Sequence, residues 1–159
     1  MQVNAIQRRQ VRALHYLTPE ELGYDIIPVA ESIIENREAA RHLTGKQRKE
    51  YLEKYQAALL AFMFKYGARS IADVTVCVLE DSDFDCILRL IHNGKDAVYK
   101  PVQLKQLVNH DQNDHVEVQT EINKLKKYNS SHDLFVSIWV NRDVAFDLSH
   151  LDFNGLRIE

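Results

Sequence analysis

The chain has 159 residues, with 20 Lys plus Arg against 23 Asp plus Glu, a net charge of −3 and 45% hydrophobic residues. This length suits one globular domain and leaves no room for a second full one. The longest apolar run, residues 57–64, is far shorter than a membrane span, and no secretory signal opens the chain, so we expect no membrane contact. The two cysteines, Cys77 and Cys86, lie inside apolar runs, which suits buried thiols in a reducing cytoplasm. The charge argues against a general polyanion binder but still permits a local basic cleft.

Helical spacing dominates the first part of the chain. Residues 3–15 are predicted to form a short helix. The stretch Thr18-Pro-Glu-Glu is typical of a helix start, although Gly23 predicts an end after one or two turns. A further helix is expected from Pro28 to about His42.

A longer helix is predicted to begin at Thr44 or Gly45 and to end at Gly67 in a left-handed cap. Its apolar residues recur at spacings of 3, 4 and 7, which predicts one apolar stripe made of Leu52, Tyr55, Leu59, Phe62 or Met63, and Tyr66.

Short apolar runs separated by turn signals follow from residue 71 onward. They predict strands at 74–79, 84–91 and 97–108 (interrupted by Pro101), a helix at 115–128, a strand at 134–140 and extended pieces at 144–148 and 156–158. The first three strands should be antiparallel, and the helical crossover should make the third and fourth parallel. This order predicts an α+β (mixed α/β) domain with one mixed sheet, in which residues 1–45 form a helical extension and 46–159 form the core.

Two of these strands carry polar residues among apolar ones. Gln103 and Lys105 share one face of the third strand, with Leu104 on the other. Asp85 lies in the apolar second strand, where an unpaired buried carboxylate would cost several kcal/mol. Taken alone, Lys105 is explained as a solvated strand lysine and Asp85 as an acid beside a turn. Together with Gln103 they suggest a functional site.

The register between these two strands decides whether the residues meet. A two-residue turn would place Asp85 opposite Val102, with Gln103 on the other face. A three-residue loop, or a bulge at Pro101, would place Asp85 opposite Gln103. The sequence permits both registers.

The order helix, strand, strand with Asp, hairpin, strand with acid-x-Lys, helix, strand resembles the PD-(D/E)xK phosphodiesterase superfamily, which has the restriction-endonuclease-like fold. The resemblance covers residues 46 to about 141. Asp85 matches the second-strand acid, and Gln103-Leu-Lys105 matches the (D/E)xK element with Gln in place of the acid. Phe84 stands where the motif has proline.

The resemblance implies a nuclease that uses Mg²⁺ or Mn²⁺. Such cations prefer oxygen ligands, which Asp85, the Gln103 side-chain carbonyl and the Leu104 main-chain carbonyl would supply. Lys105 would hold the attacking water or neutralise charge on the phosphoryl group. Because Gln carries no charge, metal binding should be weaker than with an acid at position 103.

Many members of the superfamily place a further acid on the preceding helix. Glu53 and Gln56 flank the predicted apolar stripe, whereas Glu50 lies further round the helix. We predict Glu53 as the fourth catalytic residue; the alternative is that it belongs to a solvated Lys/Glu face.

Nucleic acid is the expected partner, with DNA favoured over RNA. Basic residues of the hairpin and the last helix are the predicted phosphate contacts, namely Lys95, Lys100, Lys124 and Lys127. A protein partner or an additional recognition domain is also expected. The alternative is an inactive member of the fold that binds nucleic acid or neutralises a toxin, and a third is a plain interaction domain with an Asp85–Lys105 ion pair.

Overall fold

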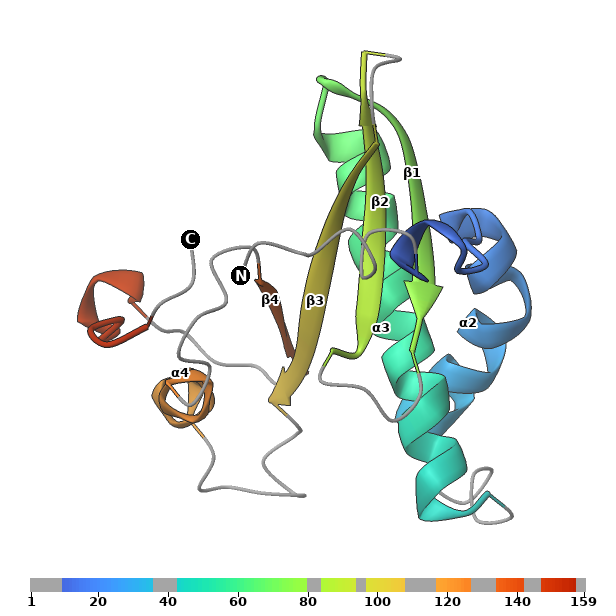
Figure 1. The fold of residues 1–159 in the computed structure, drawn as a ribbon. Coiled ribbons are helices and arrows are strands. Elements are labelled where there is room, and N and C mark those ends of the chain that lie inside the picture. Colours follow the sequence, from blue (N-terminus) through green and yellow to red (C-terminus); the bar gives the residue numbers. More distant parts are fainter. Residues whose placement is uncertain are drawn as a thin grey trace.

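The computed structural model describes residues 10–35, 43–79, 84–93, 97–107, 117–126, 134–141 and 147–156. Its strands form one sheet in the order β1-β2-β3-β4 (Figure 1). The strands are β1 Ile71–Val78, β2 Cys86–His92, β3 Ala97–Leu107 and β4 Phe135–Val140. The first three are antiparallel neighbours and β4 pairs parallel with β3. The predicted α+β class and the mixed sheet are therefore confirmed.

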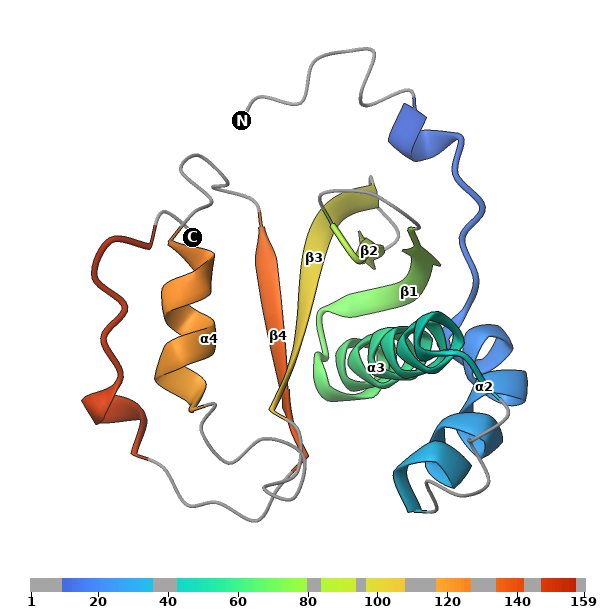
Figure 2. The ribbon, with the colours of Figure 1, turned by 90° about the horizontal axis from the view of Figure 1, so that it is seen from below.

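Helices lie on both sides of this sheet. α3 (Gly45–Gly67) packs directly on one face, and α2 (Pro19–Glu35) packs against α3 as an outer layer (Figure 2). α4 (Val118–Leu125) lies on the opposite side, next to β4 (Figure 2). Residues on alternate positions of β3 therefore face different helices.

α2 is one continuous helix, so the prediction of two helices that break near Gly23 and Pro28 was wrong. Its start is fixed as predicted, since the Thr18 hydroxyl accepts from the Glu21 N–H at 3.1 Å and the Glu21 carboxylate accepts from the Thr18 N–H at 2.8 Å. Pro28 leaves the Tyr24 carbonyl without its helical donor, but Tyr24 is exposed and water can pair with that carbonyl.

Thr44 is the N-cap of α3, as predicted, and forms a reciprocal capping box with Gln47. The predicted left-handed end at Gly67 was wrong. Gly67 is still helical, and the chain leaves the helix at Ala68 in extended geometry, with φ −104° and ψ 101°. An extended exit suits a chain that enters β1 three residues later.

The predicted apolar stripe of α3 is only partly buried. Leu52, Tyr55, Leu59 and Phe62 are half-buried, whereas Met63 and Tyr66 are each 71% exposed. The buried residues of this helix are mostly small: Gln56, Ala57, Ala58, Leu60 and Ala61. Because α3 is packed between α2 and the sheet, alanines allow close approach on both sides, and the longer side chains lie at the edges.

The strands agree with the prediction to within a few residues, but β3 is not interrupted by Pro101. β4 pairs only with Val102–Leu107, so Pro101 lies where that side of β3 has no paired strand. At the chain start, residues 10–12 are helical but residues 13–15 are not, so the predicted helix ends early; its residues 3–9 lie outside the described residues. Of the predicted extended pieces, residues 144–146 and 157–158 also lie outside; Leu148 begins the short 3-10 helix Leu148–His150, and Leu156 is not in a strand.

Candidate functional site

β2 and β3 separate at Asp85. The last regular pair between them is Cys86 with Val102, and the Asp85 N–H donates to the Val102 carbonyl at 3.0 Å. Beyond this point β3 continues beside β4 alone, through Leu107. We call this point, made of Asp85, Gln103 and Leu104, the fork.

The Asp85 carboxylate joins the two strands at the fork. Its Oδ2 accepts from the main-chain N–H of Leu104 at 2.6 Å and from the Gln103 side-chain amide. The carboxylate thus takes the place of the strand partner that Leu104 lacks. The N–H and C=O of one strand residue face the same side, so the Leu104 carbonyl faces the fork as well.

The register is the one that the candidate site requires. The pairs Ile91–Ala97 through Cys86–Val102 follow without a shift and match the three-residue register, so the two-residue alternative is not formed. Asp85 lies just beyond the last regular pair: its N–H donates to the Val102 carbonyl, while its carboxylate reaches Gln103 and Leu104. The pairing is continuous through Pro101.

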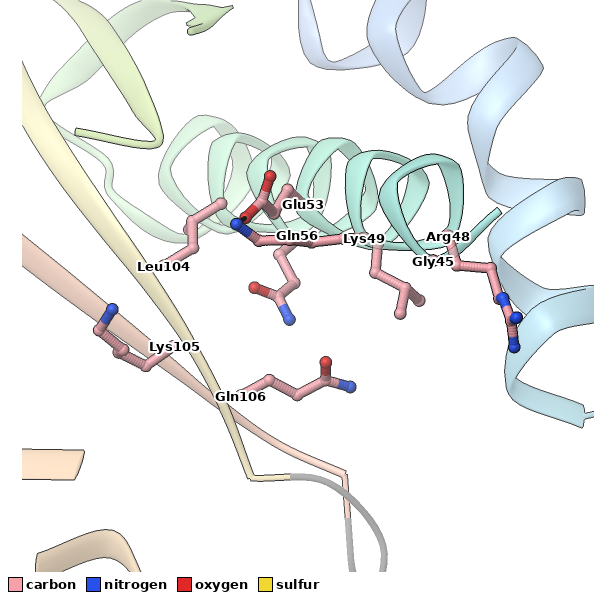
Figure 3. Close-up of a pocket in the computed structure, with 9 residues that line it drawn as sticks. Gly45, Arg48, Lys49, Glu53, Gln56, Leu104, Lys105 and Gln106 are labelled. Atoms are coloured by element: carbon pink, nitrogen blue, oxygen red, sulfur yellow. Dashed lines mark ion pairs between the residues drawn. The ribbon is translucent and has the colours of Figure 1, made fainter. Parts of the chain in front are cut away.

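Lys105 shares a face of β3 with Gln103 by strand alternation. Figure 3 shows its side chain on the side of β3 away from α3. Within the described ranges it forms no ion pair, with Asp85 or any other acid. The structural Asp85–Lys105 ion pair considered above is therefore not formed.

Glu53 lies on the other side of this strand. It is on α3, 27% exposed, and pairs with the Lys49 ammonium at 3.3 Å. Burial is the main reason why the pKa of the nearby Cys86 thiol is raised, and the charges of Asp85, Cys77 and Glu53 add to the effect. Glu53 is thus electrostatically close to the start of β2, although Lys105 extends to the opposite side.

A pocket of about 560 Å³ opens between α3 and the end of β3 (Figure 3). It is lined by Gly45, Arg48, Lys49, Leu52, Glu53, Gln56, Leu104, Lys105 and Gln106. Arg48 and Lys49 belong to the Lys/Glu face of this helix that was expected to be solvated, and no sequence pattern singles out Gln106. Their alignment depends on where α3 crosses β3, which no local pattern of the sequence encodes.

The predicted phosphate contacts have different surroundings. Lys95 and Lys127 lie outside the described residues. Lys124 is 56% exposed but pairs with Glu121 at 2.6 Å, and Lys100 is half-buried on β3. The structure therefore does not gather these four lysines into one surface that it describes.

A metal ion at the fork would have few protein ligands. In the part of the chain that the structure describes, no group of three or more His, Cys, Asp or Glu is arranged to hold a metal. Asp85 Oδ1, which no described donor contacts, and the Leu104 carbonyl are suitable oxygens, and waters or substrate phosphate would complete the shell. The Gln103 carbonyl would join them only if its amide turned and Asp85 lost a donor.

None of the described helices has the length and apolar content to cross a membrane. No family model, curated protein or solved structure matches the chain.

Proposed function

We propose that the chain is a metal-dependent phosphodiesterase of the restriction-endonuclease-like fold, acting on nucleic acid at the fork. The observation that carries the proposal is the contact of the Asp85 carboxylate with Gln103 and Leu104. It brings together residues 18 and 19 positions apart in the sequence, at the point where two strands separate. Such a separation exposes main-chain oxygen beside a carboxylate, which suits a hard cation.

The proposed roles follow from position. Asp85 and the Leu104 carbonyl would hold Mg²⁺ or Mn²⁺, which when bound supplies an acidified water and neutralises phosphate charge. Gln103 orients the Asp85 carboxylate through its amide. Lys105, one residue past Leu104 and free of ion pairs with described acids, would hold the water or the scissile phosphate. Glu53 as a further acid stays a prediction.

A single protein carboxylate binds a divalent ion weakly. The ion would therefore enter together with substrate, whose phosphate oxygens add ligands and negative charge. This arrangement accounts for a site with Gln instead of an acid at position 103.

One observation favours a second function, an inactive nucleic-acid-binding or toxin-neutralising module. The two N–H groups satisfy Asp85 Oδ2 without any metal, so Gln103 can equally serve to lock the fork. The two functions differ in what a second carboxylate at position 103 would do.

Gln103→Glu separates them. Without metal, the new carboxylate would face Asp85 at hydrogen-bond distance, and repulsion should lower the melting temperature. If the fork binds metal, Mn²⁺ should restore the melting temperature of Gln103→Glu more than it raises that of the wild type. Equal metal response in both proteins would support the inactive module.

Cleavage gives the second arm of the test. Labelled single- and double-stranded DNA and RNA are incubated with Mg²⁺, Mn²⁺ or EDTA. Wild type should cleave only with metal, and Lys105→Ala should lose cleavage while keeping its melting temperature. Lys65→Ala, which removes an equal charge from the far end of α3, is the control and should keep full cleavage.

A further inference from the structure

The pocket between α3 and β3 holds polar groups that the proposed chemistry leaves unused. Gln56 is only 7% exposed, and its amide points into the pocket from α3 (Figure 3). No hydrogen bond joins this amide to any described residue. The amide atoms of Gln56 are not among the fully buried unpaired atoms of the described residues, so they are accessible in the pocket and can pair with a ligand that enters it.

A second amide faces it. Gln106 projects from β3 toward α3, and Figure 3 shows the two amide groups pointing toward each other across the pocket. Each amide offers two donors and one acceptor, and together they match a ligand with alternating donors and acceptors along one edge. Leu52 and Leu104 add apolar surface to the lining.

The rim of the pocket is basic. Arg48 is exposed and has no ion pair with a described acid, and Lys49 is 76% exposed. Glu53 is the one acid among the lining residues and is already paired with Lys49. The rim therefore favours an anion, while the interior favours a neutral polar group.

We propose that this pocket binds one nucleotide unit, with the base between the amides of Gln56 and Gln106 and its phosphate beside Arg48 and Lys49. Amides that contact a base edge, apolar walls and a basic rim are the features of sites that bind an unstacked base. The volume of about 560 Å³ lies within the range of small-molecule sites. Binding here is independent of metal and of cleavage at the fork.

The experiment is calorimetric titration of the full chain, in EDTA, with AMP, GMP, CMP, UMP and, for comparison, ribose 5-phosphate. At least one nucleotide should bind with a Kd below about 1 mM, and ribose 5-phosphate should bind at least tenfold more weakly. Gln56→Leu and Gln106→Leu, which keep the side-chain size, should each weaken nucleotide binding about tenfold. Arg48→Ala should weaken it as well, whereas Arg69→Ala, an exposed arginine beyond the other end of α3, should not.

Melting curves establish that each variant is folded. If Gln56→Leu does not fold, Gln106→Leu, at a half-buried position, still tests the role of the amides. The proposal is overturned if no nucleotide binds the folded wild type at millimolar concentration. It is also overturned if ribose 5-phosphate binds equally well, or if neither glutamine variant changes the affinity. Because metal is absent throughout, failure of cleavage at the fork does not affect any of these outcomes.

Discussion

Polar groups on the two sides of β3 differ in whether they have hydrogen-bond partners among the described residues. On the fork side, Gln103 and the Leu104 N–H are both paired with one carboxylate of the neighbouring segment. On the α3 side, the amides of Gln56 and Gln106 line a pocket and have no hydrogen-bond partner among the described residues. Paired groups stabilise a fold, whereas accessible amides that line a pocket can pair with a ligand.

Leu104 belongs to both sides, since its N–H is at the fork and its side chain is in the core beside α3. Leu104→Ala should lower the free energy of unfolding by about 2–4 kcal/mol, because the side chain is only 6% exposed. Urea unfolding measures the change. Leu148→Ala, at a position 66% exposed, is the control and should stay within about 0.5 kcal/mol of the wild type. Equal losses for both variants would contradict the assigned core.

Asp85→Ala tests the fork itself. It leaves the Leu104 N–H and the Gln103 amide without their acceptor, so unfolding free energy should fall by about 2 kcal/mol. Asp85→Asn keeps an acceptor and should lose less. Asp25→Ala, an exposed acid of α2, is the matched control. If Asp85→Ala were as stable as Asp25→Ala, the fork contacts would contribute nothing.

The Cys86 thiol is influenced by acids on both sides of β3. Burial, together with the charges of Asp85 and Glu53, raises the pKa of this thiol above the ordinary 9.0. The folded chain then keeps a proton that the unfolded chain releases above about pH 9. Unfolding free energy should therefore fall as the pH rises above 9, with a contribution of up to about 1.4 kcal/mol per pH unit from this thiol.

Cys86→Ala should be less stable at neutral pH but should show a flatter decline between about pH 9 and 10. Urea unfolding under reducing conditions at several pH values measures both slopes. An identical slope in Cys86→Ala would mean that the thiol does not titrate differently on folding.

Lys105→Ala should have the smallest effect on stability, within about 0.5 kcal/mol, because no described acid pairs with Lys105. Thermal melts of this variant and of Lys65→Ala measure it. A loss of several kcal/mol would reveal a buried ion pair and remove Lys105 from the proposed site.

Much of the fork was predictable from local chemistry. Alternation placed Gln103 and Lys105 on one face, and the two possible turn lengths reduced the register to two alternatives, of which one puts Asp85 opposite Gln103. Thr44 and Thr18 identified helix starts, because capping depends on residues only three positions apart.

Packing decided the features that were not predicted. α2 continues through Gly23 and Pro28 although both residues disfavour a helix. An added Cβ at Gly23 would lie 2.9 Å from the Ile27 Cδ1 atom of the same helix, so glycine leaves room there for the Ile27 side chain. The same packing buries the alanines of α3 rather than its largest apolar residues. The pocket depends on the crossing of α3 and β3, which no short pattern contains.

The proposed function requires the fork to hold a divalent cation together with a phosphodiester. Anomalous diffraction from a crystal grown with Mn²⁺ and a cleavage-resistant phosphorothioate dinucleotide would locate both. We expect a manganese peak within about 2.5 Å of an Asp85 carboxylate oxygen and of the Leu104 carbonyl oxygen. A dinucleotide bound in the crystal with no manganese at the fork, or with manganese only elsewhere, would contradict it.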